Sequence, residues 1–185
     1  MGADHVGGLV ANDRRRPLIT GTHGTLMART LDHPWEYVAM SRSPLTPLEQ
    51  ADILAEVTKL LVEAMPEDWQ ELVLLLDMLG RHNQCSTRLT RADGSRESWK
   101  VPTEALKRLA SLRSGMYVDG EGTWFSCRYA VVLPGTYTIS YERQGEPPFR
   151  RPPTTEDFER EQRRFPRADA YMPDWYRAGL QQTGV

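Results

Sequence analysis

An α+β fold is indicated by one helix signal and two hairpin signals in this 185-residue chain. A capping box at Thr46–Glu49 opens a segment whose apolar residues recur at helical spacing. Two pairs of alternating segments each flank a tight-turn signal, Asp93-Gly94 and Pro134-Gly135. We therefore expect an antiparallel sheet with a leading N-terminal helix, a middle helix and a C-terminal surface helix, and no internal repeat.

The folded domain is expected over residues 44–185 as a single unit. Residues 1–43 show no sustained period of two or of 3.6 residues, so we expect a flexible or loosely attached N-terminal arm there. Met40 lies just before the first strong helix signal, and the native chain could equally begin at that residue.

The first helix is expected to begin at Pro47, because the Thr46 hydroxyl and the Glu49 carboxylate can each accept a hydrogen bond from a free backbone N–H. It should end before Pro66, which disfavours a helical conformation at the preceding residue. Residues 72–79 form a nearly continuous apolar run. That run predicts a strand covered on both faces, although a helix fits it as well.

The middle of the chain predicts a hairpin followed by a helix. Residues 84–91 alternate, and residues 95–101 should pair with them through the Asp93-Gly94 turn. The middle helix should then run from about residue 103 to residue 115.

The last hairpin contains the clearest strands. Residues 123–132 and 136–142 are rich in aromatic and β-branched side chains, and Pro134-Gly135 should turn one strand back on the other. Trp124 and Tyr137 fit the core of the sheet better than an exposed interface.

A charged surface helix is expected over about residues 155–165, with Phe158, Gln162 and Phe165 as its inward side chains. The chain then closes with apolar side chains that should dock on the sheet: Tyr171, Trp175, Tyr176 and Leu180.

Charge and cysteine content narrow the class of protein. The chain has 23 Lys and Arg against 25 Asp and Glu, a net charge of −2, which argues against a dedicated nucleic-acid binder. No run of about 18 apolar residues occurs, so no transmembrane helix is expected, and the first residues lack the pattern of a signal peptide. Cys85 and Cys127 have no metal-ligand spacing and predict two buried thiols in a reducing cytosol. A cytoplasmic protein is expected.

The charge is unevenly distributed along the chain. Residues 44–80 hold eight acids against Lys59 alone, whereas residues 81–118 hold eight bases and three acids. A solvated helix face beside a basic hairpin would explain this pattern, and so would an acidic surface that steers a cationic partner. A second acidic group should lie where the ends of the last hairpin meet: Asp119, Glu121, Glu142 and Glu146.

Catalytic patterns are weak throughout the sequence. His5, His23 and His33 fall in the expected arm, and His82 fits a solvated turn better than a general base. Cys127 alternates with its cationic neighbour and fits the core better than a nucleophile. No phosphate-binding, metalloprotease or hydrolase motif occurs. We therefore expect no enzyme activity, no cofactor and no metal.

Several short segments resemble one bacterial family. They are Gly122-Thr-Trp-Phe-Ser126, Pro134-Gly-Thr-Tyr-Thr-Ile-Ser-Tyr141 with Glu146-Pro147, Met65-Pro66-Glu-Asp-Trp69, Arg164-Phe165-Pro166-Arg167 and Met172-Pro173-Asp174-Trp175. In order and spacing they are similar to YezG-like antitoxins, which are small immunity proteins of polymorphic toxin systems. The similarity spans about residues 45–180. Many relatives carry an acidic run where this chain has Arg143-Gln144-Gly145.

The resemblance implies an α+β protein that binds a cognate toxin domain, a nuclease or an NAD-degrading enzyme, and blocks its active site. Neither nucleic acid nor a membrane is an expected partner. The candidate partner-binding residues are Asp119, Glu121, Glu142, Glu146 and Trp175. The alternative is a non-catalytic interaction or scaffolding module, and an unrecognised enzyme comes third. The sequence leaves the toxin, the binding face and the oligomeric state open.

Overall fold

The computed structural model of the chain describes residues 43–181. The expected arm, residues 1–43, lies outside this part except for Ser43. The elements follow in the order α1 (Pro47–Ala64), β1 (Trp69–Leu79), β2 (His82–Arg91), β3 (Arg96–Glu97), α2 (Thr103–Gly115), β4 (Ser126–Val132), β5 (Thr136–Glu142), α3 (Thr155–Arg164), a 3₁₀ turn (Asp169–Tyr171) and α4 (Asp174–Gln181).

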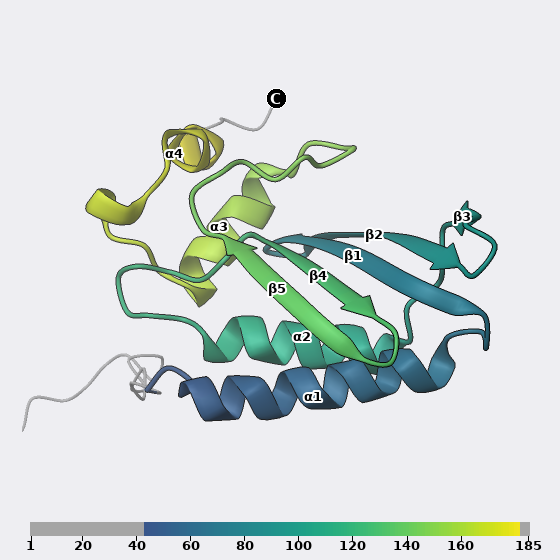
Figure 1. Cartoon of the computed structure of the whole chain (residues 1–185). Coiled ribbons are helices and arrows are strands. Elements are labelled where there is room, and N and C mark those ends of the chain that lie inside the picture. Colours follow the sequence, from purple (N-terminus) through teal and green to yellow (C-terminus); the bar gives the residue numbers. More distant parts are fainter. Residues whose placement is uncertain (1–42, 182–185) are drawn as a thin grey trace, which may run out of the picture. The chain divides into compact units, whose positions relative to one another are not determined.

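The strands form one antiparallel sheet in the order β3-β2-β1-β4-β5. Figure 1 shows α1 and α2 side by side on one face of this sheet, while α3 and α4 lie near the sheet end where β5 stops. The α+β fold expected from the sequence is thus confirmed. No helix in residues 43–181 is long and apolar enough to span a membrane.

The expected bounds of α1 are confirmed. The Thr46 hydroxyl accepts a hydrogen bond from the Glu49 amide, and the Glu49 carboxylate accepts one from the Thr46 amide at 2.8 Å. The helix ends at Ala64, and Met65 adopts an extended conformation before Pro66, as the proline requires. The terminal amides of the helix are therefore satisfied locally, and α1 needs no other element to define its start.

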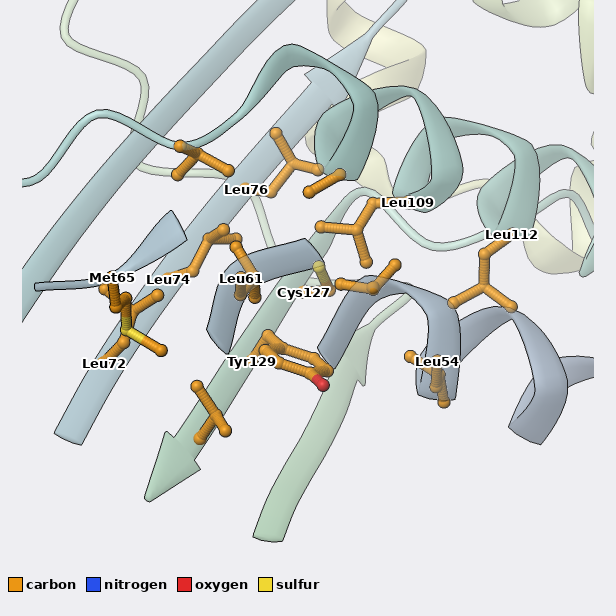
Figure 2. Packing of buried hydrophobic residues seen from close by; sticks show 14 of the residues in the cluster. Leu54, Leu61, Met65, Leu72, Leu74, Leu76, Leu109, Leu112, Cys127 and Tyr129 are labelled. Atoms are coloured by element: carbon orange, nitrogen blue, oxygen red, sulfur yellow. The ribbon is translucent and has the colours of Figure 1, made fainter. Parts of the chain in front are cut away.

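The main core fills the space between the sheet and the two helices. Alternate residues of β1, namely Leu72, Leu74 and Leu76, point to this side and are at most 4% exposed. Figure 2 shows them against Leu61 of α1 and Leu109 of α2. Each buried leucine contributes about 1.5–3 kcal/mol to stability, so this layer dominates the folding energy.

The opposite face of the sheet, which we call the open sheet face, carries a second apolar cluster at one end. There Leu79 packs with Phe125, Phe158 and Tyr176 in a second, smaller cluster. Further along β1, Leu75 remains 42% exposed. Residues 72–79 are a strand, as expected, and burial on both faces holds for most of it: on the open sheet face Val73 and Leu79 are buried, at 5% and 0% exposure, and Leu75 between them departs from the expectation.

Two expected strands are shorter than the alternation suggested. The partner of β2 was expected over residues 95–101, yet β3 is only Arg96–Glu97. The Thr87 hydroxyl exchanges hydrogen bonds with the backbone of Trp99 at 2.6 and 2.8 Å, and this side chain takes the place of the strand ladder. Similarly, β4 starts at Ser126 rather than at residue 123, because the Thr123 carbonyl accepts a hydrogen bond from the Arg167 guanidinium.

The C-terminal helices differ from expectation in which side chains they bury. Phe158 and Phe165 of the α3 region are 5% exposed, as expected, but Glu161 between them is also buried, at 1% exposure. Tyr176 docks fully, whereas Tyr171, expected to dock on the sheet, is 44% exposed. Tyr171 belongs to the 3₁₀ turn. Its carbonyl accepts a hydrogen bond from Arg167, while its ring points outward.

The buried Glu161 fastens α3 to the rest of the fold. Its carboxylate accepts hydrogen bonds from Arg113 Nη2 at 2.5 Å and from the Gly80 amide at 3.0 Å. Arg113, at the end of α2, is itself only 3% exposed and donates through Nε to the Trp124 carbonyl at 2.7 Å. One ion pair therefore ties α3 to α2, to the end of β1 and to the start of β4.

Candidate functional site

The four candidate carboxylates lie at one end of the last hairpin. Ser126 of β4 pairs with Glu142 of β5, and the Phe125 amide donates to the Glu142 carbonyl at 2.8 Å. The Pro134-Gly135 turn thus brings the loop before β4 beside the loop after β5, as predicted. We call the exposed set of Asp119, Glu121, Glu142 and Glu146 the acidic end.

The first loop of the acidic end is a tight turn locked against Arg167. The Val118 and Gly122 backbones exchange hydrogen bonds at 3.1 and 3.0 Å, and Gly120 and Gly122 have φ values of 73° and 78°. A β-carbon at Gly122 would lie 2.5 Å from Arg167 Nε, so only glycine permits this contact. The Arg167 guanidinium also stacks 4.3 Å from the centre of the Phe125 ring. Asp119 and Glu121 therefore project from a rigid support.

The second loop is held by Glu142 and Trp175. The Glu142 carboxylate accepts hydrogen bonds from the Gln144 and Gly145 amides at 2.8 and 2.9 Å. These amides hold the pKa of Glu142 below its usual value, the Gly145 amide having the larger effect. The Trp175 indole, half-buried against Phe125, donates to the Gln144 carbonyl at 2.7 Å. Trp175 thus positions the loop that presents Glu146.

The carboxylates of the acidic end form no ion pair within the described domain, although Arg143 follows Glu142 directly and the buried Arg167 contacts the first loop. The ion pairs formed among residues 43–181 involve none of its four carboxylates. Asp119 accepts a hydrogen bond from the neutral Tyr117 hydroxyl at 3.1 Å, which leaves its charge in place. Like charges on one surface produce a potential that attracts cations.

A second exposed surface, which the sequence analysis did not single out, lies on the open sheet face. Leu75 and Val132 are each 42% exposed there, and Leu133 in the adjoining turn is 50% exposed. Beside Leu75 is a hollow of about 310 Å³ lined also by Arg128 and Ser140. The signal present in the sequence is the nearly continuous apolar run of residues 72–79, for which burial on both faces was expected.

The thiols and the histidine show no catalytic arrangement. Burial, and after it the Asp77 carboxylate, raises the pKa of the Cys127 thiol to about 12, so this thiol stays protonated at neutral pH. Cys127 is buried as expected, but Cys85 is exposed, so the prediction of two buried thiols was wrong for Cys85. Cys85 pairs with Leu76 of β1 and so lies on the helix side of the sheet, yet it is exposed.

His82 is half-buried at the first position of β2 and not a solvated turn residue. Its ring packs edge-on against Phe149, with 4.7 Å between the ring centres. The other histidines, His5, His23 and His33, lie outside the described residues. Within residues 43–181, no three His, Cys, Asp or Glu side chains gather in a way that would hold a metal ion.

Sequence reasoning missed the burial of four charged residues, Asp77, Arg113, Glu161 and Arg167. A signal existed for Glu161, because it follows Phe158 by three residues and precedes Phe165 by four, so it lies on the apolar stripe of its helix. Charged residues at such positions need a buried partner, and the partner was not recognisable from spacing alone.

Comparison with known proteins adds no relative. No protein-family model matches the chain, and no curated protein matches it. The function must therefore be argued from the site and from the resemblance described above.

Proposed function

We propose that this chain is a cytoplasmic immunity protein that binds a cognate bacterial toxin domain and blocks its active site, without carrying out chemistry of its own. The observation that carries the proposal is the acidic end, a rigidly supported group of carboxylates with no cationic partner in the described domain. The similarity to YezG-like antitoxins points to the same class of function.

The physical argument rests on charge complementarity. Active sites that bind nucleic acid or dinucleotide phosphates are commonly basic, so an acidic protein surface can occupy the place of the substrate. Complementary potentials raise association rates by about ten- to a thousand-fold at low ionic strength. A standard inhibitor interface buries about 1,600 Å² in total, of which a charged surface of this kind would form one part.

The carboxylates have different parts in this proposal. Glu142 and Asp119 also serve the loops themselves, through the amides of residues 144–145 and the Tyr117 hydroxyl. Glu121 and Glu146 are exposed and are the residues best suited to contact a cation on the toxin. Trp175 presents the edge of a rigid aromatic ring beside them, a residue type that is common at interface hot spots.

The decisive experiment is co-expression of the full chain with the toxin domain encoded beside it, with survival of the host cell as the readout. Survival that depends on the chain supports neutralisation. Cell death with soluble, folded chain present would overturn the immunity proposal for that toxin and favour the interaction-module alternative.

The role of the acidic end is tested separately by charge reversal. The double variant Glu121→Lys/Glu146→Lys should slow association with the toxin about ten-fold and flatten its dependence on salt. Glu67→Lys is the matched control, because Glu67 is an exposed acid outside any ion pair of the described domain and lies beside the start of β1, at the other end of the sheet. An unchanged association rate in the double variant would refute this binding face and leave the immunity proposal to the survival assay.

A second candidate, a non-catalytic interaction module, is favoured by the open sheet face. Its exposed Leu75, Val132 and Leu133 would suit an apolar partner better than a basic active site. Val132→Lys, at the turn end of the hairpin and so at the opposite end from Glu142, would abolish binding through that face and leave binding through the acidic end intact. The two candidates therefore give opposite results in the same binding assay.

A further inference from the structure

The outer edge of β5 is a long strand edge with no protecting feature. In the described part of the chain, no strand pairs with β5 on the side away from β4. The opposite edge of the sheet is only the two-residue β3, but β5 runs for seven residues and contains no proline, lysine or bulge. Exposed edges of this kind are templates for another strand unless they are interrupted or covered.

The residues of β5 are nearly symmetric about Ile139. When a strand pairs antiparallel with its own copy, odd-numbered residues must lie opposite odd-numbered residues and even-numbered opposite even-numbered. Only such residues point to the same sheet face and direct their backbone hydrogen bonds to the same side. Centring the pairing on Ile139 uses all seven residues. It places Tyr137 opposite Tyr141, Thr138 opposite Ser140, and Ile139 opposite itself. Aromatic pairs and Thr–Ser pairs are among the stabilising cross-strand combinations.

This register also avoids electrostatic repulsion. The single charged residue of β5, Glu142, falls opposite Thr136 of the second copy and not opposite another Glu142. The two tyrosines are already oriented, because Tyr137 stacks on Tyr129 and Tyr141 stacks on Trp124, with 5.4 and 5.6 Å between ring centres. Pairing therefore costs little additional side-chain entropy.

The flank of α1 beside this edge is apolar. Residues spaced alternately three and four positions apart form one stripe along the helix, and they are exposed or half-buried. They are Leu48, Ala51, Ala55, Thr58 and Val62. Leu48 is 72% exposed. The buried core side of the helix is different, formed by Leu54, Val57 and Leu61. Spacing of three and four residues is the pattern by which one helix packs along another.

A shared hollow joins this stripe to the strand edge. It measures about 370 Å³ and is lined by Ala55, Thr58 and Val62 of α1 and by Gly135 and Tyr137 at the start of β5. Figure 1 shows α1 and β5 running in opposite directions. A seven-residue strand is about 24 Å long and an 18-residue helix about 27 Å, so the two features extend side by side over similar lengths.

We propose that the β5 edge and this flank of α1 form a two-fold interface between two copies of the chain, which joins their sheets into one. The two α1 helices then run antiparallel and meet near Ala55. In that arrangement Lys59, which borders the stripe, lies near Asp52 of the second copy, so opposite charges frame the apolar contact. The interface does not depend on the proposed toxin binding and goes beyond it.

The first test is the mass of the full chain in solution, measured by sedimentation velocity over about two decades of concentration. A species of twice the 21.1 kDa chain mass is expected. Ala55→Glu sets two carboxylates against each other at the two-fold axis and should weaken the dimer at least about ten-fold. Ala178→Glu, at an exposed alanine of α4, is the matched control and should leave the dimer unchanged. Circular dichroism checks that both variants are folded.

The second test fixes the register by disulfide formation. In a Cys85→Ser background, Thr138→Cys/Ser140→Cys places two cysteines directly opposite their counterparts, at the 4.5–5.5 Å Cα spacing typical of facing residues (about the range a disulfide needs). Mild oxidation should convert this variant to a covalent dimer. Either single cysteine would face its own copy only diagonally, at about 7–8 Å, and should cross-link far less.

Three results would each overturn the proposal. A monomer at every concentration overturns the proposal, and so does a dimer that Ala55→Glu leaves intact. Cross-linking of the double-cysteine variant no greater than that of the single variants also overturns it. None of these measurements uses a toxin, so failure here is distinct from failure of the proposed function.

Discussion

Replacing Glu161 with leucine should destabilise the protein strongly, because it leaves a buried guanidinium without its counterion. The side chains of Glu161 and Arg113 are 2% and 4% exposed, and their charged atoms are 2.5 Å apart. After Glu161→Leu, Arg113 retains only the carbonyls of Trp124 and Met78. Removing one partner of a buried ion pair costs about 3–5 kcal/mol.

The Gly80 amide adds to this loss. It donates to Glu161 at 3.0 Å from a half-buried position, and an amide that loses its acceptor costs up to about 1–3 kcal/mol. The total, about 4–8 kcal/mol, is a large part of the 5–15 kcal/mol that is typical of whole domains. At about 2–4 °C per kcal/mol for a chain of this length, it corresponds to a fall in Tm of roughly 8–32 °C. Urea denaturation followed by tryptophan fluorescence measures the change directly.

The double variant Arg113→Met/Glu161→Leu tests the reasoning further. It removes both charges and leaves only unpaired backbone groups, so it should lose about 1–3 kcal/mol, less than Glu161→Leu alone. The charge argument would be refuted by a Glu161→Leu variant within about 1 kcal/mol of the parent chain. A double variant that loses at least the sum of the two single losses would refute it as well.

Three further predictions concern a turn, a helix cap and the thiols. Gly80→Ala should cost more than Gly94→Ala in urea denaturation, because both glycines have positive φ but only a β-carbon at Gly80 would collide with the Asp157 backbone; equal losses would exclude that collision. Burial raises the pKa of Asp157, but hydrogen bonds from Thr154 and a backbone amide lower it more, so its folded pKa lies below the unfolded value. The contribution of Asp157 to the free energy of unfolding is therefore present above the unfolded pKa and is lost as the pH falls through the folded pKa. Asp157→Asn should make the free energy of unfolding fall less steeply in this acidic range. In the native protein at pH 8, iodoacetamide should modify Cys85 and spare Cys127, as read by mass spectrometry; modification of Cys127 at an equal rate would contradict its burial.

Local signals predicted three of the four helices described and the last hairpin well, and missed α4. Thr46, Glu49 and Pro66 fixed both ends of α1, because capping and proline sterics act within a few residues of the chain. The Pro134-Gly135 turn determined the pairing of β4 with β5, and with it the meeting of the two loops of the acidic end. These features depend on sequence neighbours, so a pattern along the chain is sufficient to find them.

Strand lengths were predicted less well, because side chains from elsewhere compete for backbone groups. Thr87 bonds the backbone of Trp99 and stops β3, and Arg167 takes the Thr123 carbonyl before β4 begins. Alternation in residues 95–101 and 123–125 is the same with or without these contacts. Nothing in the local pattern distinguishes a paired backbone group from one bonded to a distant side chain.

Composition and local spacing, taken alone, determined that this chain is an α+β protein and where α1, α2 and α3 begin and end, but not that Asp174–Gln181 forms the helix α4. The exposure of Leu75 and of Cys85, the burial of Glu161, and the support that Arg167 and Trp175 give to the acidic end were decided by the tertiary structure. The physical reason is the distance along the sequence over which each kind of interaction acts. A cap or turn is satisfied by residues three or four positions away, whereas burial depends on which distant element covers a side chain. The Arg113–Glu161 pair spans 48 positions of sequence, and only the folded chain brings its two charges together.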